Sequence, residues 1–343
     1  MHPFLRPAFA LFLLLSLPAL AKDEKVLETV RRGIALHDAG RYEEAIAAYR
    51  EALRIEPDSP LALYELAMTL NSSGNHEECV RIGDQALKKA KELRPELYTV
   101  TGNCLDHAGN PKRAVKIYKK GLKEFPNDAN LAFNYAVTEF GQERYPEARK
   151  LIEIAIAERP GHASSYRLLA HIHHKEGSMI RALLSALRFL SLEPTGPRAR
   201  EMAGLAYALL NRGVEQKSES EITITIDKAT VNEGPFSPIA AFVGLSSALR
   251  FHEDNRGKPE SSQVAMQLES LLKILDESSE LVRPGTFDND RLVLPLVAIL
   301  RAGHQEAFAY QAFSSLGLAG TEAWMNAHPP ELGALAAMLR SLR

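Results

Sequence analysis

The sequence lacks most features that mark enzymes and nucleic-acid-binding proteins. Its 343 residues include 41 basic and 43 acidic side chains, so the near-neutral balance gives no overall basic field for nucleic acid. No G-x-S-x-G, H-E-x-x-H, C-x-x-C or phosphate-binding glycine loop occurs. We therefore expect a protein that is not an enzyme and uses no cofactor. An enzyme active in the C-terminal region is an alternative.

Cysteine is also scarce. Cys79 and Cys104 are the only two cysteines, too few for a disulfide framework. Two interpretations stay open. The cysteines are small buried residues in helix packing, or they pair in an oxidising compartment.

Long apolar runs are missing except at the N-terminus. The run Ala8–Leu17 follows the basic residue Arg6 and precedes a small-x-small site at residues 19–21. This order is typical of a secretory signal peptide, here residues 1–21. The run is shorter than the roughly 20 apolar residues of a membrane-spanning helix, and charged residues follow at once. We expect export to the periplasm or the medium, without a transmembrane segment after cleavage; an uncleaved anchor is the alternative.

A pattern of small, aromatic and proline residues first seen in Gly40–Pro57 recurs along the first two thirds of the chain. Two sets of residues return every 34 positions: Ala114, Ala148 and Ala182, and Pro126, Pro160 and Pro194. Ala45 precedes Ala114 by 69 residues, which is two such periods plus one residue. An imperfect unit with one inserted residue must therefore lie between them.

This pattern resembles the tetratricopeptide repeat, whose period is 34 residues. In the first unit Gly33 takes the small position of helix A, Gly40 the turn, and Tyr49 the aromatic position of helix B. The second unit is irregular, since Cys79 and Gly83 replace the usual alanine and aromatic residue. Small residues let paired helices nest, the aromatic fills the gap to the next unit, and proline ends helix B.

The resemblance implies an all-α fold. We expect a tetratricopeptide α-solenoid of about five helix-turn-helix repeats plus a capping helix over residues 22–212. A linker at 213–235 and a small, mainly helical C-terminal domain at 236–343, with a short extended segment before it, would follow.

The resemblance also implies a binding groove, because the A helices of such solenoids line the concave face. Aromatic side chains beside amides can anchor an extended peptide and hydrogen-bond its backbone. The candidate peptide-binding residues on this face are Tyr64, Met68, Asn71, Asn103, Asp106, Phe133, Asn134, Phe140, Arg167, His171 and His174. The alternative is that they are solvated or packing residues of a structural spacer.

Two narrower hypotheses find little support. Asn103 and Asn134 match the asparagine positions of carboxylate-clamp tetratricopeptide domains, but Thr99 and Ser164 replace the lysines and Arg167 is one residue off, so we expect no clamp. His171 and His174 share a helix face, without a carboxylate or cysteine at ligand spacing. We expect no metal site there, although histidine protonation would make binding pH-sensitive.

The segment Glu221–Asp227 alternates isoleucine with threonine, which predicts a short strand or extended arm. We expect its isoleucines to pack on neighbouring helices; pairing with Ala229–Val231 or with a partner's strand is the alternative. Further on, Gly303–Tyr310 and the sole tryptophan, Trp324, are similar to the region that follows tetratricopeptide arrays in uncharacterised bacterial proteins, a resemblance that implies no activity.

These patterns favour a non-enzymatic scaffold or adaptor that binds a protein or an extended peptide segment in the groove, in the cell envelope. The competing class is a structural component of an envelope assembly.

Overall fold

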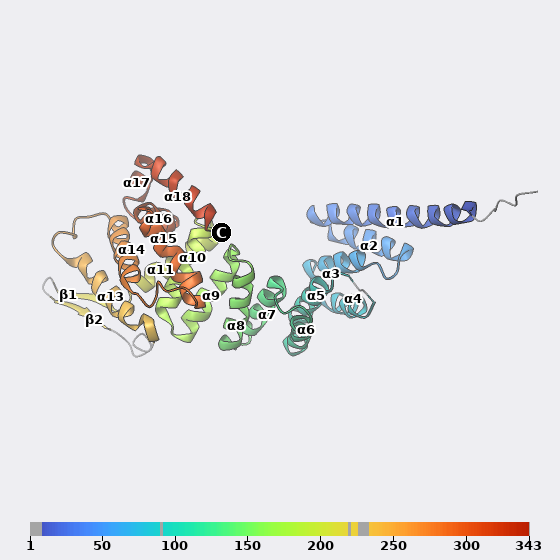
Figure 1. Cartoon of the computed structure of the whole chain (residues 1–343), viewed down its shortest axis with the longest axis horizontal. Helices are drawn as coiled ribbons and strands as arrows, with labels where there is room; N and C mark the ends of the chain where they lie inside the picture. The colour runs from blue at the N-terminus through green and yellow to red at the C-terminus, as the bar shows by residue number, and fades with distance from the viewer. Residues whose placement is uncertain (1–8, 90–91, 219–220, 226–232, 343) are drawn as a thin grey trace, which may run out of the picture. The chain divides into compact units, whose positions relative to one another are not determined.

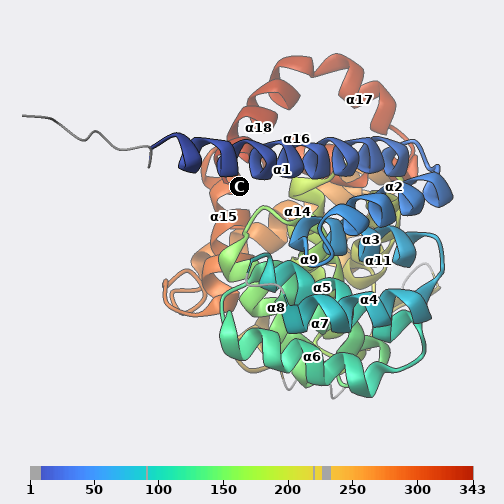
Figure 2. The same cartoon turned by 90° about the vertical axis from the view of Figure 1, so that its right-hand side faces the viewer.

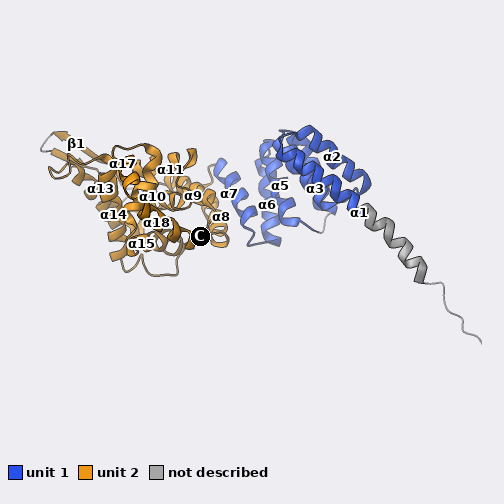
Figure 3. Ribbon diagram, turned by 90° about the horizontal axis from the view of Figure 1, so that it is seen from above, with its two compact units in different colours: residues 1–142 blue, residues 143–343 orange. Residues whose placement is uncertain are grey.

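The computed structural model describes the backbone of residues 9–89, 92–218, 221–225 and 233–342, with side chains from residue 23 onward. The chain is built almost wholly of α-helices, which confirms the predicted fold class (Figure 1). Contacts divide it into two compact units, residues 1–142 and 143–343, which Figure 3 colours separately. Within the described residues, no helix is long and apolar enough to cross a membrane.

The first unit is a series of helices in which each packs on the next. Figures 1 and 2 both show the first two side by side. Its elements are α1 (Phe9–Asp38), α2 (Tyr42–Ile55), α3 (Pro60–Ser72), α4 (His76–Lys89), α5 (Arg94–His107), α6 (Pro111–Glu124) and α7 (Ala129–Gly141).

Close approach of paired helices occurs at the predicted small positions. The ring of Tyr49 covers Gly33, and the ring of Tyr118 covers Gly102, so tightly that neither glycine has room for a Cβ atom. Tyr118 also stacks on Tyr135 of the next helix, with ring centroids 5.4 Å apart. The aromatic residue therefore joins the two helices of its own repeat and fills the gap to the following one, as expected.

Glycines form the turns between paired helices. Gly40, Gly74, Gly109 and Gly177 have positive φ values of 71°, 82°, 74° and 80°, which favour glycine. The intervals between these turns place the one inserted residue between Gly74 and Gly109, in the predicted unit. Glu143 stands at the equivalent position of the fourth repeat with φ 60°, so a side chain occupies a left-handed turn.

The second unit continues with helix pairs and then the C-terminal helices. Its elements are α8 (Tyr145–Glu158), α9 (Ala163–Glu176), α10 (Met179–Leu192), α11 (Pro197–Leu210), β1 (Val214–Ser218), β2 (Glu221–Ile224), η1 (Gly234–Phe236), α13 (Ser237–Ala248), η2 (Leu249–Phe251), α14 (Glu260–Glu277), η3 (Asp288–Val293), α15 (Leu294–Arg301), α16 (Gln305–Phe313), η4 (Ser314–Leu316), α17 (Thr321–Ala327) and α18 (Pro329–Ser341). Helix α10 is buried almost all round and contacts α9, α11, α13, α15 and α16.

The two strands form an antiparallel hairpin in which Val214 lies opposite Ile224. The predicted strand at 221–224 is thus present, but its partner is the segment that we assigned to a polar linker. The alternative partner, residues 229–231, and Ile226 lie outside the described residues. Ile224 rests against Gly244 of α13, as expected, whereas the side chain of Ile222 is exposed.

Polar contacts anchor the C-terminal region on α10. The buried carboxylate of Glu233 accepts a hydrogen bond from the backbone N–H of Ile180 at 3.1 Å, in the first turn of α10. Burial raises the pKa of Glu233, against the effect of this hydrogen bond. Nearby, Arg181 binds Asp288 at 2.7 Å, and Nε of Arg188 donates to the carbonyl of Arg291. The C-terminal helices therefore belong to the same compact unit as the last repeat, while the boundary at 213–235 stays a prediction.

Replacing Glu143 by glycine is expected to stabilise the protein by about 1 kcal/mol, because a left-handed backbone conformation costs a side-chain-bearing residue about that much. Urea denaturation measures the change in the free energy of unfolding. Glu143→Ala, which keeps a Cβ atom, is the control. An equal gain in both variants would contradict the backbone explanation.

Replacing Glu233 by alanine is expected to lower the free energy of unfolding by about 1–3 kcal/mol, since the N–H of Ile180 stays buried without an acceptor. Glu233→Gln keeps an acceptor and removes the buried charge, so its loss is expected to be smaller. Because folding raises the pKa of Glu233, this group favours folding most when protonated. Wild type should therefore gain stability relative to Glu233→Gln as the pH falls from 7 to 5.

Candidate functional site

A hollow of about 210 Å³ opens in the first unit between α3, α5 and α7. Because these are the A helices of successive repeats, their side chains meet on one face of the unit. Four predicted groove residues line the hollow together: Tyr64, Met68, Asn103 and Asn134. It therefore unites residues that are up to 70 positions apart in the sequence.

The two asparagines are held by bonds that leave one donor and one acceptor available. Oδ1 of Asn103 accepts from the hydroxyl of Tyr118 at 2.6 Å, and Nδ2 of Asn134 donates to the carbonyl of Asn130 at 2.8 Å. Nδ2 of Asn103 and Oδ1 of Asn134 have no hydrogen-bond partner in the described part of the chain. The hollow thus presents an amide donor and an amide acceptor on neighbouring helices.

Acidic side chains set the electrostatics of this hollow. Glu96 and Asp128 line it, and none of the lining side chains is basic. Asp128 is already engaged, because its carboxylate caps α7 by accepting from the N–H of Leu131 at 2.7 Å. Burial, followed by the charges of Glu65 and Glu96, raises the pKa of Tyr64, which keeps its hydroxyl protonated. A bound carboxylate would find no counter-charge here.

Other predicted residues of the first unit lie outside the hollow. The side-chain oxygen of Asn71 lies 3.2 Å from Nδ1 of His76 and 2.9 Å from Nδ1 of His107. Asp106 accepts from the hydroxyl of Thr138 at 2.8 Å. Phe133 and Phe140 are half-buried on α7 and do not line the hollow.

Counting positions along the A helices missed three further polar residues that line the hollow. Glu96 and Asp128 lie at the start of α5 and α7, and Asn130 lies one turn before Asn134. Our count began at the fifth position of each helix and so passed over these first turns. The helix N-caps, which Pro95 and Asp128 signal in the sequence, could have found them.

The remaining predicted residues lie in the second unit. Arg167 and His171 on α9 both bind the carboxylate of Glu201 on α11, at 2.8 Å and 2.9 Å. Burial tends to raise the pKa of Glu201, but the hydrogen bond and charge of Arg167 lower it overall. Burial and the charge of Arg212 lower the pKa of His174. No cluster of three metal-ligating side chains occurs among the described residues.

A second hollow, of about 470 Å³, is polar and bears on the enzyme alternative. Its charged side chains already pair with one another: Arg149 with Glu176 at 3.1 Å, and Arg181 with Asp288 at 2.7 Å. Buried His173 lies 3.7 Å from Glu176. These ion pairs tie α8, α9 and α10 to residues 286–288, and the hollow contains no arrangement of nucleophile and base.

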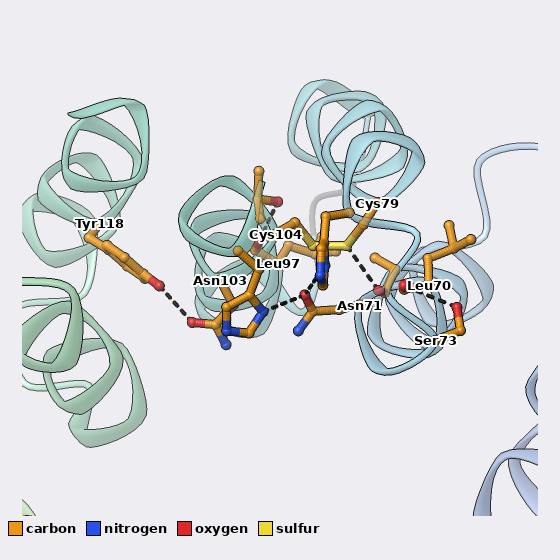
Figure 4. The surroundings of a disulfide bond; sticks show 12 residues. Leu70, Asn71, Ser73, Cys79, Leu97, Asn103, Cys104 and Tyr118 are labelled. Atoms are coloured by element: carbon orange, nitrogen blue, oxygen red, sulfur yellow. Dashed lines mark hydrogen bonds between the residues drawn. A yellow bond between two sulfur atoms is a disulfide. The ribbon is translucent and has the colours of Figure 1, made fainter. Parts of the chain in front are cut away.

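The two cysteines form a disulfide between α4 and α5, with Cα atoms 5.8 Å apart. Figure 4 shows it beside Asn71 and Asn103. It spans the unit with the inserted residue, where Gly83 replaces the usual aromatic residue and meets Thr101 of α5. Of the two interpretations left open by the sequence, the structure has the paired one.

Comparisons with known proteins agree with the repeat pattern. One family model, described as TPR repeat, matches residues 33–74, and another, Tetratricopeptide repeat, matches residues 107–172. Hsp70-Hsp90 organizing protein 1 of Glycine max is 25% identical over 200 residues, 48% of this chain and 35% of that protein. Surface lipoprotein assembly modifier 1 of Neisseria meningitidis serogroup B is 30% identical over 104 residues, 30% of this chain and 18% of that protein.

Among solved structures, a thermophilic TPR protein of Thermus thermophilus aligns with 54% of this chain and 98% of its own, at 20% identity and a TM-score of 0.45. The matched regions cover only about a third or less of the length of the two curated relatives. The two family matches, together with the paired helices and their glycine turns, show that this chain is a tetratricopeptide repeat protein.

Proposed function

We propose that this protein is an exported, non-enzymatic adaptor that binds an extended peptide or protein segment in the hollow between α3, α5 and α7. The observation that carries the proposal is the free amide donor of Asn103 and the free amide acceptor of Asn134, flanked by Tyr64 and Met68. An extended backbone presents both carbonyl acceptors and N–H donors, so it can satisfy both asparagines at once.

The dimensions and charge of the hollow define the segment further. A volume of about 210 Å³ suits one side chain of a peptide, which would pack on Tyr64 and Met68. The nearby carboxylate of Glu96 and the lack of a basic lining residue favour a neutral or basic segment. A C-terminal carboxylate is disfavoured, which is consistent with the missing clamp lysines.

The names of the relatives support the adaptor role. The protein from Glycine max is named for organizing Hsp70 and Hsp90, and the protein from Neisseria meningitidis is named for modifying surface lipoprotein assembly. We carry over only the general role of bringing proteins together, because the matched regions are short.

Two observations support the periplasmic or secreted location. The signal-like sequence of residues 1–21 directs export, and the Cys79–Cys104 disulfide is a bond that persists in oxidising compartments.

Site-specific photo-cross-linking in the native cell tests the groove. A photoreactive amino acid at Met68, in the hollow, is expected to give adducts with a partner protein, whereas one at Gln85, exposed on α4, is expected to give none. Adding Asn134→Leu, which removes the free acceptor, should reduce the adduct about two- to ten-fold. Mass spectrometry identifies the partner.

The distribution of adducts separates the alternatives. One constant, stoichiometric neighbour captured from both Met68 and Gln85 would indicate a structural component of an assembly. Absence of adducts at Met68 under conditions in which the protein is folded would rule out the groove as the binding site.

Reduction of the disulfide is expected to lower the free energy of unfolding by about 3 kcal/mol, because the bond closes a loop with a sequence separation of 25 residues. Thermal melts with and without dithiothreitol measure the effect. The double variant Cys79→Ser/Cys104→Ser should melt at the lower temperature and should not respond to dithiothreitol. Isolation of the native protein with free thiols would count against an oxidising location.

A further inference from the structure

The near-neutral balance of the whole chain conceals a strongly basic helix. Helix α6 (Pro111–Glu124) carries six basic side chains and one acidic one, in a chain whose formal net charge is −2. Five of the basic residues are lysines with exposed side chains: Lys112, Lys116, Lys119, Lys120 and Lys123. We refer to these five residues as the lysine face.

The lysine face is a continuous stripe on one side of the helix. Its residues are spaced by four, three, one and three positions, which at 100° per residue places them within an arc of roughly 100°. At a rise of about 1.5 Å per residue the stripe is about 17 Å long. The charges therefore act together on one surface.

These lysines are not neutralised within the described residues. None of the five makes an ion pair there, and Lys120 lies 5.9 Å from the centroid of the Tyr98 ring. The nearby arginines differ, because Arg113 pairs with Asp84 at 3.2 Å and Arg94 with Glu124. The acidic residue of the helix is thus already used by an arginine.

The exposed side of α6 has no anchor for a specific protein partner. Its best-buried residues, Ala114, Val115, Tyr118 and Gly121, face the other helices, and no large apolar side chain of α6 is exposed. Specific protein interfaces depend on buried aromatic or arginine anchors. A row of flexible lysines instead suits a surface of diffuse negative charge, since each ammonium acts as a point charge.

We infer that the lysine face of α6 binds the phosphate headgroups of an anionic lipid bilayer. Clusters of four to eight basic residues on a helix are attracted to acidic membranes by about 1 kcal/mol for each lysine near the surface. The preference for lipid over nucleic acid rests on the proposed export, because an exported protein meets membrane surfaces. The lysine face is separate from the hollow of the proposed peptide site, so either can fail without the other.

Vesicle co-sedimentation tests the inference directly. The purified protein without residues 1–21 is mixed with vesicles of phosphatidylcholine alone or with 30% phosphatidylglycerol, at about 50 mM and 500 mM salt. We expect binding only to the phosphatidylglycerol vesicles and only at low salt, because salt screens exposed charges. Replacing all five lysines by glutamine, a good helix former, should reduce the partition coefficient at least 100-fold.

A matched control separates this face from net charge. Substituting glutamine at five scattered, exposed lysines, Lys25, Lys88, Lys150, Lys175 and Lys217, changes the charge equally and should leave most of the binding. Circular dichroism checks that both variants are folded. Equal loss in both variants, or unchanged binding of the α6 variant, would overturn the proposal. So would a wild-type protein that binds polyglutamate or DNA but not the acidic vesicles.

Discussion

The structure depends on the contact between an aromatic ring on one helix and a glycine on its partner. Where Tyr49 covers Gly33 and Tyr118 covers Gly102, two helix backbones approach more closely than larger side chains would allow. A single repeat has too little apolar surface to form a core by itself, so this nesting must be repeated along the chain. The second unit of the array departs from the rule, since Gly83 replaces the aromatic residue. There the Cys79–Cys104 disulfide links the two helices that the ring would otherwise help to hold.

Nesting assigns the small and aromatic residues to packing and leaves other surfaces of the helices for binding. Amides of the A helices therefore gather in the hollow, while the lysines of α6 remain in solvent. At the end of the array no further repeat follows, and α10 would expose its apolar sides. The C-terminal helices cover it instead, and the carboxylate of Glu233 satisfies a backbone N–H of its first turn. The C-terminal region thus completes the array as well as following it.

The sequence was sufficient for features that recur at a fixed period. The helix pairs, the glycine turns and the inserted residue all depend on local chemistry, so spacing alone could predict them. The partner of the strand at 221–224 could not be predicted, because β1 contains mainly polar residues and its pairing depends on the neighbouring helix α13. Glu143 was also missed, since nothing in its side chain signals a left-handed backbone. The period places it there, because it lies 34 residues after Gly109.

The candidate site shows the same limit in its electrostatics. The A-helix count identified Tyr64, Met68, Asn103 and Asn134, but treated each side chain as available to a ligand. The structure shows that Arg167 is engaged by Glu201, which lies 34 residues later and so occupies the equivalent position of the next repeat. In a solenoid, charges one period apart are neighbours, and opposite charges there neutralise each other. Charges without such a partner, as on α6, are those left to act on other molecules. Comparing each charge with the residue one period away therefore separates internal pairs from candidate binding surfaces, which the net charge of −2 cannot do.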